Sequence, residues 1–127
     1  MQQKLDWIIL ATDNYEKSYL FYKDILGLEV EREVREEEFC QFKLQNCYIA
    51  IYGRKFLEQL VGKEFIKNAG GAIYALCESD NIDQQYEELK NKGVNFIKTP
   101  TTQSWGQKTA YFTDPDGHIW EIQQWMK

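Results

Sequence analysis

The chain has 127 residues, of which 43% are hydrophobic and 15% aromatic, which suffices for one packed domain and excludes a disordered chain. Its formal net charge of −5 excludes nucleic acid as an expected partner, because affinity for phosphates comes from Lys and Arg. The apolar runs are shorter than the ~18 residues of a membrane span, and the polar start of the chain lacks the apolar region of a secretory signal. We therefore expect a cytoplasmic protein with no membrane partner.

The first half of the chain predicts one strand, one helix and three further strands. Residues 5–12 form an apolar strand-like run, and Asp13 with Glu16 resembles the capping box that opens a helix. Gly27 is placed to end that helix, because glycine tolerates the left-handed conformation found just past helix ends. A stripe at helical spacing indicates that the helix packs on a sheet, and it consists of Tyr15, Tyr19, Tyr22 and Leu26. The strands expected next are residues 28–35, 38–44 and 47–52.

The second half repeats this order after a connecting segment. Residues 54–68 are expected to form a helix that leads into a loose turn at residues 68–71. An apolar strand at residues 72–79 follows, and then a helix that opens at Asp80 and ends at Gly93. An Asp-Pro-Asp-Gly turn, in which proline and glycine supply the required backbone angles, separates the last two strands. The three strands expected in this half are residues 94–98, 107–113 and 118–125.

Each half therefore reads β-α-β-β-β. Repeat 1 covers about residues 4–53, the connecting helix about 54–68 and repeat 2 about 70–126. One such half cannot bury both faces of a four-stranded sheet, whereas two halves together can. We expect a single α+β domain over residues 1–127, in which the two repeats form a curved, cup-shaped mixed sheet with the helices outside. A concave face lined by side chains is a typical small-molecule site.

Each half also carries one recognisable motif. Ser18, Phe21, Tyr22 and the run at residues 26–28 form the pattern SxxFYxxxLGL, and residues 110–122 read AYFTDPDGHIWEI. Both patterns resemble those of the vicinal oxygen chelate superfamily, which comprises glyoxalases, bleomycin resistance proteins and extradiol dioxygenases. The resemblance covers nearly the whole chain and implies the cup-shaped fold and a small-molecule ligand. It also implies a homodimer, which relatives of this size often form.

The resemblance further implies where a metal would bind. Enzymes of the superfamily hold one divalent metal through His or Glu side chains on the first and last strands of each half. Glu121 occupies such a position on the last strand, and Asp6 lies nearest the position on the first strand. The corresponding positions of the other two strands hold Ala50 and either Ile73 or Tyr74, and none of these is a usual ligand.

The metal-ligand set is therefore poor. The only histidine, His118, belongs to the turn motif and alternates to the strand face opposite Glu121, so we expect it to be structural. Glu121 and Asp6 are then the only ligands on offer, whereas a catalytic site normally holds its metal with at least three protein ligands. We expect no metal and no other cofactor. The alternative is a divalent ion (Zn, Ni, Mn, Fe or Mg) held by Glu121 and Asp6.

Strand alternation predicts which side chains line the cup. The positions expected to face inward are Asp6, Ile8, Leu10, Tyr48, Ala50, Tyr52, Tyr74, Leu76, Tyr111, Glu121 and Gln123. A loop at residues 99–107 is expected at the rim, where Trp105, next to Gly106, either closes over a ligand or anchors the loop. Glu121 is the candidate catalytic residue. The candidate ligand-binding residues are Asp6, Tyr48, Tyr52, Tyr74, Trp105, Tyr111 and Gln123.

Several aromatic rings and two carboxylates suit a flat aromatic or cationic compound, which they would bind by stacking and cation–π contacts. We therefore expect a metal-independent small-molecule-binding protein, similar to bleomycin resistance proteins. The alternative is a divalent-metal-dependent, glyoxalase-like lyase or isomerase, or a thiol transferase, that uses Glu121. A third reading is an interaction module without a ligand.

Overall fold

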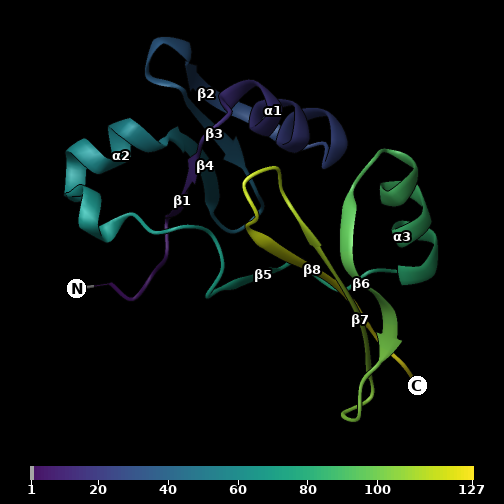
Figure 1. Ribbon diagram of the computed structural model, residues 1–127. Helices are drawn as coiled ribbons and strands as arrows, with labels where there is room; N and C mark the ends of the chain where they lie inside the picture. Colours follow the sequence, from purple (N-terminus) through teal and green to yellow (C-terminus); the bar gives the residue numbers. More distant parts are fainter. Residues whose placement is uncertain (1) are drawn as a thin grey trace. The chain divides into compact units, whose positions relative to one another are not determined.

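The computed structural model describes residues 2–127, which divide into two compact units, one ending at Asn68 and the other covering Ala69–Lys127 (Figure 1). Each unit contains one four-stranded mixed sheet, and each follows the order strand, helix and three strands. The prediction of two β-α-β-β-β units is therefore confirmed. That the units act as one domain stays a prediction. Within residues 2–127 no helix combines the length and apolar character needed to cross a membrane.

The sheet of the first unit has the strand order β1-β4-β3-β2. The edge strand β1 runs parallel to β4, while β3 is antiparallel to both β4 and β2. The helix α1 continues into a π-helical turn over Phe21–Ile25, in which the Leu26 N–H donates to the Phe21 carbonyl at 2.9 Å. The bounds are β1 Trp7–Thr12, α1 Tyr15–Leu20, β2 Glu29–Val34, β3 Phe39–Lys43, β4 Tyr48–Gly53 and α2 Arg54–Val61.

The second unit repeats this arrangement with the strand order β5-β8-β7-β6. Again the first strand, β5, pairs in parallel with the last strand, β8, and the other pairs are antiparallel. The bounds are β5 Ile73–Ala75, α3 Ile82–Asn91, β6 Asn95–Thr102, β7 Gln107–Thr113 and β8 Ile119–Trp125.

Asparagine side chains open both main helices. Asn14 accepts from the Lys17 N–H at 3.2 Å, and Asn81 accepts from the Gln84 N–H at 3.1 Å. The predicted cap at Asp13 is wrong by one residue, because the Asp13 carboxylate instead pairs with Arg54 at 2.6 Å. Helix ends are as predicted: Gly27 (φ +71°) and Gly93 (φ +92°) adopt the left-handed conformation after the last turn.

Each helix packs on one face of its own sheet. In the first unit the Tyr22 and Phe42 rings lie 5.7 Å apart over a fully buried layer that includes Ile49 and Ile51. In the second unit the Tyr86 ring of α3 contacts Phe96 at 4.6 Å, and Phe96 contacts Phe112 at 5.4 Å. The tyrosine stripe of the first helix therefore serves packing. The opposite face of each sheet is the one that can present a functional group.

Three predicted bounds are wrong. The connecting helix ends at Val61 rather than at residue 68, because Gly62 (φ +109°) leaves the helical conformation. Strand β5 has only three residues instead of the eight predicted. Strand β6 continues to Thr102, so the expected rim loop shrinks to residues 103–106. Pro100 is tolerated there because β6 is an edge strand whose register with β7 shifts between Lys98 and Thr101.

Candidate functional site

The candidate site in the second unit lies on the sheet face opposite α3. Glu121 stands in the middle of β8, with Tyr111 of β7 on one side and Ala75 of β5 on the other. The next pair along this face is Gln123 with Thr109. Glu121, Tyr111 and Gln123 are half-buried. The prediction that these three side chains share a face holds, because directly paired residues point to the same side of a sheet.

The Tyr111 phenol is the protonated partner of Glu121. Burial raises the pKa of Tyr111, a hydrogen bond with Thr109 opposes the rise, and the hydrogen bond with the Glu121 carboxylate adds to it. The phenol therefore keeps its proton at neutral pH and can donate to Glu121. The pair presents a carboxylate that is oriented but not neutralised by a cation among the described residues.

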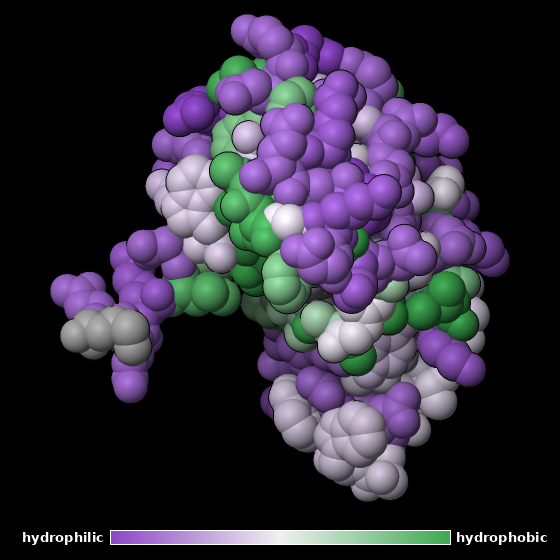
Figure 2. Space-filling view, turned by 60° about the vertical axis from the view of Figure 1, so that its left-hand side comes forward, coloured by the Kyte–Doolittle hydropathy of each residue, from purple (hydrophilic) through white to green (hydrophobic). Residues whose placement is uncertain are grey.

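A row of side-chain hydrogen bonds crosses the same face nearer the β6–β7 hairpin. The Trp105 indole N–H donates to Gln107 Oε1 at 2.9 Å. Gln107 Nε2 donates to Gln123 Oε1 at 2.8 Å, and Gln123 Nε2 donates to the Leu76 carbonyl at 3.2 Å. Trp105 remains 57% exposed at the hairpin tip. Figure 2 shows large side chains of intermediate hydropathy, drawn nearly white, at the bottom of the molecule. The β6–β7 hairpin lies at the same level in Figure 1.

The first unit presents an aromatic cluster on the face opposite α1. The Trp7 ring lies 6.2 Å from Phe39 and 5.9 Å from Tyr48, and the Phe39 ring lies 5.3 Å from Tyr52. The Arg32 guanidinium sits 5.5 Å from the centre of the Phe39 ring. Tyr48 and Tyr52 therefore lie on the predicted face, whereas sequence reasoning missed Trp7 and Phe39.

The predicted face of β1 is wrong by one residue. Ile8 and Leu10 pair with Ile49 and Ile51, the buried residues under α1, so they do not face a site. Trp7 and Ile9 take their place. Asp6 precedes β1, and its side chain is 64% exposed and pairs with Lys4 at 3.5 Å. The error arose because β1 is apolar on both sides, so alternation alone did not define its face.

The same error occurs in β5. Tyr74 pairs with Trp120, and their rings lie 5.4 Å apart on the face that α3 covers. Burial raises the pKa of Tyr74, and the nearby Asp114 carboxylate adds to the rise. Leu76 lines a hollow beside α3, so the structure puts Ala75 next to Glu121 in place of the predicted Tyr74 and Leu76.

The donor set around Glu121 does not fit a catalytic metal. Its neighbours on the sheet, Ala75, Tyr111 and Gln123, supply no imidazole and no second carboxylate. His118 lies in the turn before β8, where its backbone N–H donates to Asp114 Oδ1 at 2.8 Å. In the described part of the chain, no three His, Cys, Asp or Glu side chains are grouped so that they could hold a metal.

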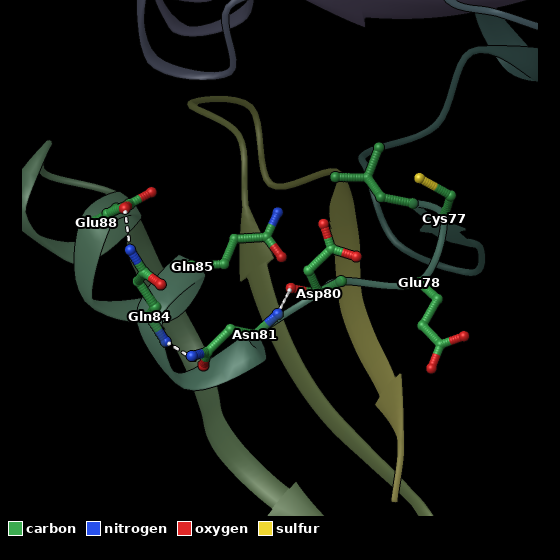
Figure 3. A pocket seen from close by; sticks show the side chains of 9 residues that line it. Cys77, Glu78, Asp80, Asn81, Gln84, Gln85 and Glu88 are labelled. Atoms are coloured by element: carbon green, nitrogen blue, oxygen red, sulfur yellow. Dashed lines mark hydrogen bonds between the residues drawn. The ribbon is translucent and has the colours of Figure 1, made fainter.

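A second feature of this unit is a hollow of about 480 Å³ between α3 and the segment that leads into it. Figure 3 shows Gln84, Gln85 and Glu88 projecting from α3, and Cys77, Glu78 and Asp80 coming from the preceding segment. Gln85 Oε1 is buried and has no hydrogen-bond donor among the described residues. None of these residues was predicted for a site. In the sequence, Asp80 and Asn81 indicated only the start of a helix at this place. Nothing in the sequence indicated a cavity.

Comparison with known proteins assigns nearly the whole chain to one family. The family model described as Glyoxalase/Bleomycin resistance protein/Dioxygenase superfamily matches residues 4–122. The uncharacterized protein YraH of Bacillus subtilis (strain 168) is 31% identical over 123 residues, which cover 94% of this chain and 96% of YraH. The metallothiol transferase FosB of Staphylococcus saprophyticus is 26% identical over 122 residues, which cover 96% of this chain and 77% of FosB.

Solved structures show the same fold. A glyoxalase/bleomycin resistance protein/dioxygenase from Nocardioides superposes with a TM-score of 0.84 at 22% identity, over 100% of this chain and 86% of that one. A lactoylglutathione lyase from Agrobacterium tumefaciens superposes with a TM-score of 0.77 at 14% identity, over 98% of this chain and 95% of that one. At these identities the likeness establishes the fold, and the predicted fold class is confirmed.

Proposed function

Since this chain belongs to the glyoxalase/bleomycin resistance protein/dioxygenase superfamily, we propose that it is a small-molecule-binding protein that takes a flat aromatic or cationic compound without a metal. The observation that carries the proposal is the Glu121–Tyr111 pair. It offers an oriented carboxylate on a face that contains no imidazole, because the only histidine of the chain lies elsewhere.

Charge and ring chemistry define the expected ligand. A carboxylate that is half-buried and forms no ion pair attracts a cation more strongly than a fully solvated one. The exposed ring of Trp105, in the same unit as Glu121, favours planar groups through stacking and cation–π contacts. The ligand we propose therefore combines a planar ring system with a positive charge.

The test is a fluorescence titration with proflavine, a planar monocation. We expect saturable binding, and we expect Glu121→Gln to weaken it about tenfold, because one charge-assisted contact is lost. Glu87→Gln removes the same charge from an exposed position of α3 and serves as the matched control, with an expected change below about twofold. Equal affinity of the Glu121→Gln variant and the wild type would contradict the proposal.

A second candidate function is a divalent-metal-dependent thiol transferase or glyoxalase-like lyase. The identity to a protein named metallothiol transferase favours it, as does the carboxylate at Glu121. Metal analysis of protein purified without chelator separates the two candidates. Near-stoichiometric Ni, Zn, Fe or Mn that is lost in Glu121→Ala would support the enzyme, whereas metal below about one-tenth of the protein concentration supports the binding protein.

We also propose that the protein is a homodimer in the cytoplasm, as its membership of this family implies. Light scattering of the purified chain measures the molar mass and distinguishes the dimer from the monomer.

A further inference from the structure

We call the row of hydrogen bonds that joins Trp105, Gln107, Gln123 and Leu76 the amide relay. Its hydrogen bonds can run in only one direction from donor to acceptor. An indole nitrogen can only donate, and a backbone carbonyl can only accept. With Trp105 at one end and the Leu76 carbonyl at the other, both glutamine amides must turn their oxygens toward Trp105 and their nitrogens toward Leu76. The orientation of each amide is thus determined by the two ends of the relay and not by either glutamine alone.

The relay rests on backbone that is itself held in place. At one end the hairpin tip is closed by the Gln103 N–H, which donates to the Gln107 carbonyl at 2.8 Å, and by the Met126 N–H, which donates to the Gly106 carbonyl at 2.9 Å. At the other end the Leu76 N–H donates to the Glu121 carbonyl at 3.0 Å. Both ends are therefore tied to β7 and β8, the strands that carry the candidate site.

We infer that Gln107 and Gln123 are positioning residues that hold the exposed indole of Trp105 in one orientation at the edge of the Glu121 face. Gln123 was predicted to bind ligand directly. In the structure one donor and the carbonyl oxygen of its amide are engaged within the protein. Its contribution is then indirect, through the orientation that it gives to Gln107 and hence to Trp105.

The relay also determines what Trp105 can offer. Its single N–H is already bound to Gln107, so a ligand meets only the ring. Gln123 stands two residues from Glu121 along β8, which corresponds to about 7 Å. The site would therefore recognise a planar ring against Trp105 together with a positive charge near Glu121. This part of the inference rests on the proposed function, whereas the positioning of the indole does not.

The relay is tested without ligand by NMR of the indole N–H groups. The chain has four tryptophans and hence four indole signals, and Trp105→Phe identifies the signal of Trp105. We expect this N–H to exchange with solvent at least about fivefold faster in Gln107→Ala, and faster also in Gln123→Ala, with unchanged melting temperature. Gln107→Glu keeps an acceptor for the indole but loses the donor to Gln123, so its exchange rate should lie between those of the wild type and Gln107→Ala. Gln59→Ala, at an exposed position of α2, is the control and should leave all four signals unchanged.

Unchanged exchange of the Trp105 indole in Gln107→Ala would overturn the inference, whatever the ligand result. The ligand part is tested by a double-mutant cycle with proflavine. Gln107→Ala should weaken binding about threefold in the wild type, because a mobile indole must be ordered on binding, and should have no effect in the Trp105→Phe background. An equal effect in both backgrounds would show that Gln107 does not act through Trp105. No binding of proflavine to a protein with an intact relay would refute the proposed function alone.

Discussion

At the scale of single residues, the three cysteines differ in how deeply they are buried, and burial determines the reactivity of a thiol. Cys40 is fully buried, Cys47 is half-buried and Cys77 is exposed. Burial raises the pKa of Cys40 to about 12, and the Glu33 carboxylate adds to the rise, while Tyr15 and Arg35 oppose it. Cys40 is thus a small apolar core residue and not a reactive thiol.

The raised pKa of Cys40 predicts how stability depends on pH. Below pH 9.0, the ordinary pKa of the thiol, both the folded and the unfolded state keep the proton. As pH rises from 9 toward about 12, the unfolded state loses it first, so the free energy of unfolding falls. We expect a shallower fall in Cys40→Ala and no change of slope in Cys77→Ala, measured by urea denaturation at several pH values. The same slope in both variants would contradict this assignment.

At the scale of elements, the sequence predicted the type and order of the strands and of the main helices, because alternation, helical spacing and glycines report local structure. The prediction of which side chains of β1 and β5 face the site was wrong. Both strands are apolar on both sides and lie at a sheet edge next to a parallel partner, so their side chains give no polar alternation. Only the register with β4 and β8 shows that Trp7 and Ala75, rather than Asp6 and Tyr74, stand on the site faces.

The caps of the two main helices give the prediction that belongs to this scale. Asn14→Ala and Asn81→Ala should each reduce the free energy of unfolding by about 1 kcal/mol, because each removes the acceptor for one N–H of the first helical turn. Urea denaturation at pH 7 measures the change. Asn68→Ala, at an exposed position outside helices and strands, should change it by less than about 0.5 kcal/mol. A loss at Asn68 as large as at the caps would indicate that the capping bonds contribute nothing specific.

At the scale of the whole molecule, the repeat was visible in the sequence but the difference between its halves was not. Equivalent sheet faces hold an aromatic cluster around Trp7 in the first unit and a polar row around Glu121 in the second. The motifs that reveal the family lie mostly in turns and on the packed faces, where glycine, proline and large apolar residues determine the backbone, although the second motif also carries Tyr111 and Glu121. Alternation placed Tyr111, Glu121 and Gln123 correctly, but Trp7 and Phe39 were missed because their places depend on strand pairing over long sequence separations.

Each sheet also has an outer antiparallel edge, and its side chains bear on how the protein behaves when concentrated. An open strand edge can recruit further chains and seed aggregation. On β6, Pro100 removes one donor from that edge and Lys98 adds a charge. On β2, Glu29, Glu31 and Arg32 place exposed charges along the corresponding edge. Pro100 and these exposed charges therefore make both outer edges poor templates for pairing with another chain.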